Sequence, residues 1–204
     1  MFQNVSKSGS AAALYSAGGV QMIKGLPDAP VVAGTISPRA PRGEPLAISD
    51  DGAYLLFIPA GGPLELLGAA GESRQIAASA PGSMAAFAPG SHDAAIIQSG
   101  KPTLFQDISG AATQRTLDAI AAPSALAFSP DARKLLVSSA SGRSVTVIQV
   151  ATGERSILTC DCAPASLVPM GPLFRLTELG AAPLWLLDMA MERGLFFVPA
   201  PAAP

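Results

Sequence analysis

Short apolar runs separated by turn signals recur along the chain, and they are clearest between residues 125 and 158. Four such runs lie there, at Ala125–Phe128, Lys134–Ser138, Ser144–Val150 and Arg155–Leu158. The segments between them contain Ser-Pro-Asp, Ser-Gly and Thr-Gly, which favour tight turns. This pattern predicts a four-stranded antiparallel meander in a unit of about 40 residues.

The turn after the first run of this unit has counterparts elsewhere in the chain. The five turns fall in register when their second residues are aligned, at Ser6, Ser49, Ala88, Ser129 and Val168. These positions are 43, 39, 41 and 39 residues apart, so the chain repeats with a period of about 40 residues. We therefore expect one repeat domain over 1–198, with repeats at about 1–43, 44–82, 83–122, 123–163 and 164–198, and an Ala/Pro-rich tail at 199–204.

The middle run of the fourth repeat carries apolar residues on both faces. In a strand, Val145 and Val147 point to one side while Ile148 and Val150 point to the other. Such a strand must be covered on both sides, as in a blade packed between two neighbouring blades. The equivalent runs in the other repeats are Val20–Ile23, Leu64–Leu67, Thr103–Ile108 and Leu184–Met189.

The fold class follows from the repeats. Their first runs are built from small residues, as in Ala85-Ala86, which suits strands that converge on a central axis. We expect almost no helix, because Pro123 ends the short Ala-rich run at 119–122. The sequence predicts an all-β β-propeller of four-stranded antiparallel blades in about five repeats, either a closed five-bladed ring or part of a larger propeller.

Composition narrows the classes of partner. Charged residues make up 14% of the chain and hydrophobic residues 49%, with 20 Gly and 19 Pro, which is typical of a sheet-rich and turn-rich protein. A net charge of -2 gives no general attraction to phosphate backbones, so we expect no nucleic-acid partner. We also expect no transmembrane segment, since every apolar run is interrupted before the roughly 18 residues that a spanning helix needs.

With the repeats aligned, the chain resembles the YVTN and WD40-like β-propeller repeat family. Ala127–Asp131, followed by Val145–Gln149 and Thr152-Gly153, matches the family pattern, and Ile48–Gly52 with Tyr54–Phe57 is a second match. The motif makes turns and a core, so the resemblance implies a fold rather than a chemistry. Most propellers of this kind are binding platforms, and a minority are enzymes with a site at the mouth of the channel.

The resemblance also bears on the compartment. Family members are often exported, and the Ala, Gly and Pro richness looks bacterial, but the first ten residues lack the basic start and apolar stretch of a signal peptide. We expect an extracytoplasmic protein if the natural N-terminus lies upstream of Met1, and a cytoplasmic one otherwise.

Candidate catalytic residues are few. His92, the single histidine, lies in the turn after the first strand of the third repeat, where we expect it to be solvated. We expect Asp50, Asp51 and Asp131 to hydrogen-bond the backbone of their own turns. No nucleophile elbow or Gly-rich loop occurs in the sequence, so we expect no catalytic set, no cofactor and no metal. An enzyme would need three or more carboxylates, or a carboxylate and His92, within metal-bonding distance.

Two further features predict structural rather than chemical roles. Cys160 and Cys162 are separated by one residue, a spacing that permits only a strained small-ring disulfide and offers too few ligands for zinc, so we expect plain loop thiols. Trp185 alternates with leucines, and we expect it in the core of a blade rather than in a ligand site.

Polar residues on the loops at one end of the predicted blades form a candidate binding rim. They are Arg39, Arg42, Lys101, Arg143 and Asp161. The loops share one end because first and third strands run one way and second and fourth the other. The sequence thus favours a non-catalytic binding or scaffold module with a protein or peptide partner, while its oligomeric state stays open. The alternative is an enzyme resembling lactonase-type or lyase-type propellers.

Overall fold

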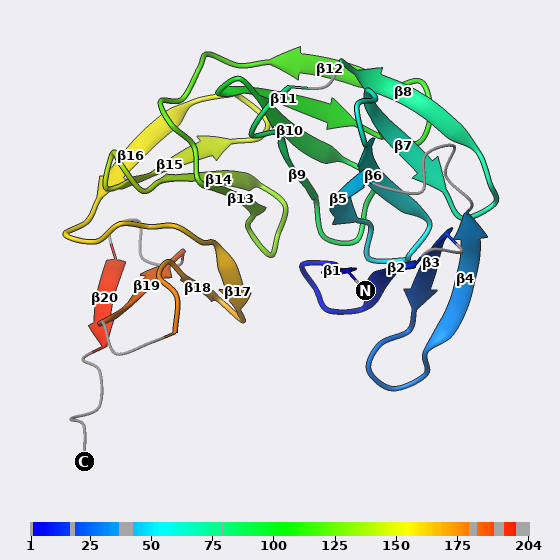
Figure 1. Ribbon diagram of the computed structural model, residues 1–204. Helices are drawn as coiled ribbons and strands as arrows, with labels where there is room; N and C mark the ends of the chain where they lie inside the picture. Colours follow the sequence, from blue (N-terminus) through cyan, green and yellow to red (C-terminus); the bar gives the residue numbers. More distant parts are fainter. Residues whose placement is uncertain are drawn as a thin grey trace. The chain divides into compact units, whose positions relative to one another are not determined.

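The computed structural model describes residues 2–16, 19–36, 43–78, 80–179, 183–189 and 194–198. Within these residues the protein is all-β, with five four-stranded antiparallel sheets and no helix (Figure 1). Each sheet is a meander whose strands follow one another in sequence order. The predicted fold class, an all-β β-propeller of four-stranded antiparallel blades, is confirmed. None of the described segments is a helix able to cross a membrane.

The chain divides into two compact units, and the first, Met1–Asp118, holds three sheets. The first sheet contains β1 (Phe2–Val5), β2 (Ala11–Ser16), β3 (Gly19–Lys24) and β4 (Val31–Ile36). The second contains β5 (Gly43–Ile48), β6 (Tyr54–Pro59), β7 (Leu64–Gly68) and β8 (Ser73–Ala77). The third contains β9 (Met84–Phe87), β10 (Ala94–Gln98), β11 (Lys101–Gln106) and β12 (Thr113–Thr116).

The second unit, Ala119–Pro204, holds two sheets. The fourth sheet contains β13 (Ala125–Phe128), β14 (Lys134–Ser139), β15 (Ser144–Gln149) and β16 (Arg155–Thr159). The fifth contains β17 (Val168–Met170), β18 (Leu173–Arg175), β19 (Leu184–Asp188) and β20 (Gly194–Val198). The strands of the fourth sheet lie within one residue of their predicted bounds, because apolar alternation and turn residues set strand ends locally.

Apolar clusters join neighbouring sheets inside each unit. In the first unit, Met22 of the first sheet packs with Phe57 of the second, and Leu56 of the second packs with Ile96 of the third. In the second unit, Val147 of the fourth sheet packs with Phe174 of the fifth. Fully burying a side chain of this size stabilises a fold by about 1.5–3 kcal/mol, so these clusters supply much of the driving force for packing.

The middle strand β15 is buried on both of its faces, as its sequence predicts. Val145 and Ile148, which point to opposite sides, are both 0% exposed, and Val147 is also buried. The outer strand β16 is different, because only Leu158 is half-buried and the rest of the strand is exposed. The fourth sheet therefore combines a buried inner strand, β15, with an accessible outer strand, β16.

The turn after the first strand of a sheet is built in the same way in the second and fourth sheets. The Ser49 hydroxyl accepts the N–H of Tyr54, and the Ser129 hydroxyl accepts the N–H of Lys134, both at 2.9 Å. A residue with a positive φ follows in each turn, Gly52 at 66° and Ala132 at 59°. The equivalent positions of two distant repeats thus have the same local structure.

Candidate functional site

Asp50 links the three sheets of the first unit through its turn. Its carboxylate accepts hydrogen bonds from the Ser8 hydroxyl (2.5 Å) and from the N–H of Gly90 (3.1 Å). Its backbone carbonyl accepts a further bond from the Ser10 hydroxyl (2.6 Å). The prediction that Asp50 bonds its own turn is therefore wrong, because its side chain points toward the turns of the two neighbouring sheets, whose positions only the folded chain defines.

Asp51 does bond its own turn, as predicted, and it also contacts the next sheet. It accepts bonds from the Ser49 hydroxyl (2.6 Å) and the N–H of Ala53 (3.0 Å). Its other oxygen lies 2.9 Å from Nε2 of His92, whose ring packs edge-on against Tyr54 with centroids 4.7 Å apart. His92 is partly solvated, with a side chain 31% exposed, but its ring also has two partners that the sequence did not predict, Asp51 and Tyr54.

The pKa of Asp51 reflects these contacts. Burial acts to raise the pKa, but the bonds from Ser49, Ala53 and His92, together with the charge of His92, outweigh burial and hold the pKa below its usual value. In the described part of the chain, no group of three or more His, Cys, Asp or Glu side chains is placed to hold a metal ion. The pair is thus a hydrogen-bonded bridge between two turns.

Asp131, the counterpart of Asp51 in the second unit, also bonds its own turn as predicted. It accepts bonds from the Ser129 hydroxyl (2.6 Å) and from the N–H of Arg133 (3.1 Å). The Ser129 bond is the main reason that the pKa of Asp131 is lowered; burial opposes it, and the N–H and charge of Arg133 add to it.

A groove of about 650 Å³ runs beside the outer strand of the fourth sheet. Its lining consists of Lys134, Val147, Gln149, the run Glu154–Leu158, Asp188 and Met189. Successive residues of a strand point to opposite faces, so five consecutive lining residues show that the groove reaches the edge of β16, while Lys134, Val147 and Gln149 place the rest of it on one face of the sheet. Asp188 and Met189, from the end of β19, supply the fifth sheet's share of the lining.

A second cavity of about 420 Å³ shares Lys134 and Met189 with this groove. Its other lining residues belong to two turns, Ser129–Asp131 of the fourth sheet and Gly171-Pro172 of the fifth. Lys134 therefore lies where the two spaces meet. It is half-buried, and no ion pair of its ammonium group occurs among the described residues. We call the two spaces together the β16 groove.

The predicted rim residues are only partly brought together. In the second unit, Arg143 and Asp161 are exposed, and the carbonyl of Arg143 accepts the N–H of Cys160 at 2.9 Å, so their two loops touch. Lys101, also exposed, begins β11 in the first unit. Arg39 and Arg42 lie outside the described residues. None of the three described rim residues lines the β16 groove.

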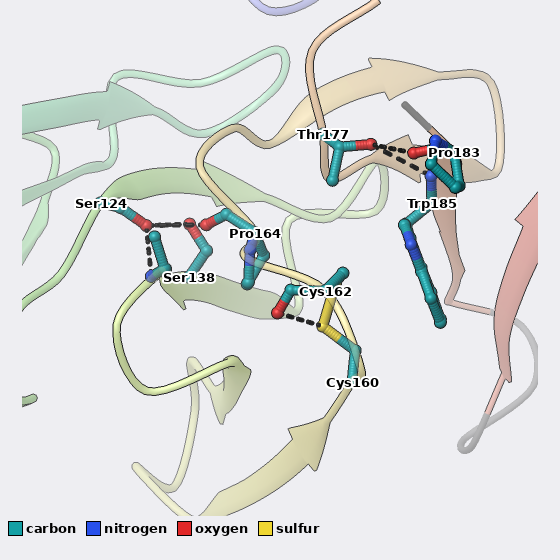
Figure 2. The surroundings of a disulfide bond; sticks show 9 residues. Ser124, Ser138, Cys160, Cys162, Pro164, Thr177, Pro183 and Trp185 are labelled. Carbon is teal, nitrogen blue, oxygen red and sulfur yellow. Dashed lines mark hydrogen bonds between the residues drawn. A yellow bond between two sulfur atoms is a disulfide. The ribbon is translucent and has the colours of Figure 1, made fainter. Parts of the chain in front are cut away.

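Cys160 and Cys162 form a disulfide, so the expectation of loop thiols is wrong (Figure 2). The main chain reverses at Asp161 and brings the two Cα atoms to 5.1 Å, within the usual range for a disulfide. Both cysteines are buried in the apolar cluster of the second unit, and Trp185 packs against this cluster while half-buried. Nearby, the Ser124 hydroxyl donates to the carbonyl of Pro164 at 2.8 Å, which ties the following loop to the sheet.

Sequence reasoning missed the residues of the β16 groove. Glu154, Arg155 and Ser156 are an ordinary polar end of an outer strand in the sequence, and Lys134 is an ordinary strand start. The available signal was weak: a lysine occupies the position where the second repeat has Tyr54. That difference predicts a cavity only when the residues that face Tyr54 and Lys134 in the folded chain are known.

Comparison with protein-family models finds no match, and comparison with curated proteins finds none either. Solved structures do resemble this chain. Dihydro-heme d1 dehydrogenase NirN, solved in complex with DHE, has a TM-score of 0.61 and 22% identity, and the match covers 98% of this chain and 47% of that one. A functionally unknown protein from Desulfotomaculum acetoxidans DSM 771 has a TM-score of 0.66 and 14% identity, over 96% of this chain and 68% of that one.

A third similar structure is the Cps50 (Swd1) β-propeller domain of Myceliophteria thermophila. Its TM-score is 0.64 at 16% identity, and the match covers 91% of this chain and 63% of that one. This chain thus spans about half of the NirN chain and about two thirds of the other two. Identities this low show the fold alone, which is a β-propeller. Membership of the YVTN family stays a prediction.

Proposed function

We propose that this chain is a non-catalytic β-propeller module that binds a segment of a partner protein in the β16 groove. The observation that carries the proposal is the groove of about 650 Å³ along an exposed strand edge. Its volume lies within the range of about 300–1,000 Å³ that is typical of ligand sites. The lining combines charged residues with Val147, Ile157 and Leu158, a mixture that suits a peptide.

The rim provides a second proposed surface for the same class of partner. Arg39, Arg42, Lys101, Arg143 and Asp161 would act through exposed charges, which influence association rate and orientation more than affinity and are screened by salt. The rim and the groove share no described residue, so substitutions can separate the two surfaces.

Selection of peptides from a random display library on the immobilised full chain tests the proposal. Enriched peptides would be synthesised with a fluorescent label, and their Kd measured by anisotropy for the parent, for Ile157→Lys in the groove and for Arg143→Glu on the rim. Ile157 is 67% exposed and Arg143 is exposed, so both variants should fold, which thermal melts would verify.

The groove predicts at least about tenfold weaker binding for Ile157→Lys, with Arg143→Glu close to the parent, because a lysine in the lining replaces an apolar contact. The reverse pattern would move the site to the rim. A library that yields no peptide specific for the chain would contradict the binding-module proposal itself.

The enzyme alternative is favoured by one observation, the contact between Asp51 and His92 at 2.9 Å. A carboxylate beside His92 is one of the two arrangements named for that alternative, and here the two groups contact each other directly. A panel of lactones and aryl esters, assayed with added divalent metals against the parent and His92→Asn, tests it. Turnover that His92→Asn abolishes would favour a lactonase-type or lyase-type enzyme over the binding module.

A further inference from the structure

We propose that copies of this chain associate through two sheet faces, with the fifth sheet of one copy packed on the first sheet of the next. The proposal is independent of the binding of a partner segment and rests on residues outside the β16 groove. Three features lead to it: the repeated way in which neighbouring sheets pack, the exposed apolar face of the first sheet, and the incompletely covered face of the fifth.

Neighbouring sheets within each unit pack through equivalent positions. We call the face that a sheet turns toward the following sheet its forward face, and the opposite one its rear face. Leu56 and Leu136 are equivalent, because they follow Tyr54 and Lys134, the two matching turn ends, by two residues. Leu56 packs with the third sheet and Leu136 with the fifth. The repeat therefore uses one kind of contact, a forward face on a rear face.

The rear face is buried in the second and third sheets. A row of three apolar residues crosses three strands of each sheet, and its members lie directly opposite one another. None of these residues is more than 9% exposed. The rows are Ile48, Leu55 and Leu67 in the second sheet and Phe87, Ala94 and Phe105 in the third. A rear face of this composition is thus the surface on which the preceding sheet packs.

The rear face of the first sheet has the same row, but the row is exposed. Val5 precedes the turn residue Ser6 as Ile48 precedes Ser49, so the two positions are equivalent. Val5 lies opposite Ala12, Ala12 opposite Ile23, and Ile23 opposite Val32, which extends the row across all four strands. Val5 is 53% and Val32 58% exposed, and Ile23 is half-buried. Covering this row would remove apolar surface from water, which favours association.

The forward face of the fifth sheet has the opposite role. Arg175 lies opposite Val168 on one side and Leu186 on the other. Phe174 and Leu187 point to the rear of the same sheet, where they pack with the fourth sheet and are 0% exposed. On the forward face, by contrast, Val168 is 37% exposed and Leu186 is half-buried. Among the described residues, the fifth sheet is therefore covered fully on its rear face only.

Arg175 gives the forward face a hydrogen-bond donor that lacks an acceptor. Its side chain is 16% exposed, and its Nε is buried without a hydrogen-bond partner among the described residues. Its guanidinium lies 3.6 Å from the carboxylate of Glu178 through another nitrogen. On the rear face of the first sheet, Gln21 and Thr35 lie opposite each other and are exposed. The side-chain carbonyl of Gln21 can accept the Nε–H, which a buried donor needs.

These two faces specify a second copy as the occupant. The first sheet offers an exposed rear face, and the fifth offers an exposed forward face with the donor that the other can satisfy. One contact between the fifth sheet of one copy and the first sheet of another covers both, and it continues the packing found inside each unit. Because the contact joins two different surfaces, it produces a closed ring or an open row of copies rather than a symmetric pair.

Sedimentation velocity of the full chain over a wide range of concentration tests the proposal. We expect species heavier than the 20.5 kDa chain, with a share that rises with concentration. Val32→Lys on the rear face and Val168→Lys on the forward face should each sediment as a monomer, because either change removes one half of every contact. Val31→Lys is the matched control: Val31 is 51% exposed in the same strand but points to the opposite side, so this variant should associate like the parent.

All three positions are exposed, so the variants should fold, which thermal melts would verify. Met170→Lys provides a second change on the fifth sheet, since Met170 is 50% exposed and alternates with Val168 onto the same face. It replaces Val168→Lys if that variant melts at a lower temperature than the parent.

Mixing Val32→Lys with Val168→Lys tests which surfaces meet. The first variant keeps an intact fifth sheet and the second an intact first sheet, so together they should form one contact and sediment as a one-to-one dimer. A symmetric pair through either face would leave one of the two variants associated on its own. That result would overturn the proposal, and so would a parent that stays monomeric at every concentration.

The donor of Arg175 has a separate readout. Gln21→Leu removes the acceptor and adds apolar surface at an exposed position. We expect the dissociation constant of the assembly to rise about threefold or more, because a buried donor is left without a partner. Association that is unchanged or stronger in Gln21→Leu would overturn the pairing of Arg175 with Gln21 and the packing of the two faces that it defines.

Discussion

The turns after the first strands are built alike in the two units, but they contact the next sheet differently. In the first unit Asp51, Tyr54 and His92 close the space between the second and third sheets. In the second unit the aligned residues are Asp131, Lys134 and Pro172, and they line a cavity of about 420 Å³. Proline has no side-chain donor, so Pro172 cannot make the bond to Asp131 that His92 makes to Asp51.

The preceding position in the turn also differs between the two units. Asp50 bridges the turns of all three sheets in the first unit, whereas Pro130 occupies its place in the second. The same turn motif therefore supports either a hydrogen-bonded closure between two sheets or an open cavity between them. The choice depends on residues that leave the local backbone of the turn unchanged.

The largest expected effect comes from the core that both kinds of turn depend on. Leu136 is 0% exposed, so Leu136→Asp buries a carboxylate without a partner. The cost is comparable with the whole free energy of unfolding of a domain, about 5–15 kcal/mol. We expect loss of the cooperative thermal transition and of native circular dichroism, with Leu136→Met retaining both. A folded Leu136→Asp protein would contradict the assigned core.

The bridge made by Asp50 should be the most costly polar contact to remove. Asp50→Ala deletes the bonds from Ser8 and Gly90, and we expect the free energy of unfolding to fall by about 1–2 kcal/mol in urea denaturation. The exposed Asp28 provides a control, since Asp28→Ala should change it by less than about 0.5 kcal/mol. Equal effects of the two variants would show that the bridge adds nothing to stability.

The disulfide belongs to the second unit alone. Replacing Cys160 and Cys162 together by Ala opens a loop of three residues, for which the chain-entropy estimate is about 1.6 kcal/mol. We expect a loss of that size in urea denaturation. Mass spectrometry after alkylation of the unfolded, unreduced parent should find no free thiol. Two alkylated cysteines in that sample would show that the disulfide does not form.

A stabilising substitution exploits the remaining difference between the two turns. Ala132 has a φ of 59°, a region that costs a residue with a Cβ about 1–2 kcal/mol. Ala132→Gly should therefore raise the free energy of unfolding by about 0.5–1 kcal/mol, after the extra freedom of Gly in the unfolded chain is subtracted. Gly52→Ala should do the opposite, because its Cβ would lie 3.2 Å from the carbonyl oxygen of Ile23. Melting temperatures measure both.

The smallest expected effect is on the decline of the free energy of unfolding at acid pH. The pKa of Asp51 and that of Asp131 are both lowered in the folded chain. Their contribution is present in full above the unfolded pKa of about 3.9 and is lost as the pH falls through the lower folded pKa. Asp51→Asn and Asp131→Asn should each flatten the decline in unfolding free energy between about pH 5 and pH 2. An unchanged slope in both would contradict the assigned hydrogen bonds.

The strands, their turns and the buried faces of β15 were readable from the chain alone. Alternation, a period of about 40 residues and turn residues such as Ser49 and Ser129 are local properties, and strand bounds follow from them. The same locality explains why Asp51 and Asp131 were placed correctly, since each bonds a hydroxyl and an N–H within two residues of itself.

The bridge of Asp50, the contact of His92 and the β16 groove were decided by the tertiary structure. Asp50 bonds residues 42 and 40 positions away, and His92 contacts one 41 positions away, a full repeat in each case. Strand pattern cannot reveal such partners, because it says which face a side chain occupies and nothing about the residue opposite. Lys134 is a surface lysine in the sequence. It comes to line a cavity only because the packed fifth sheet places Pro172 and Met189 beside it.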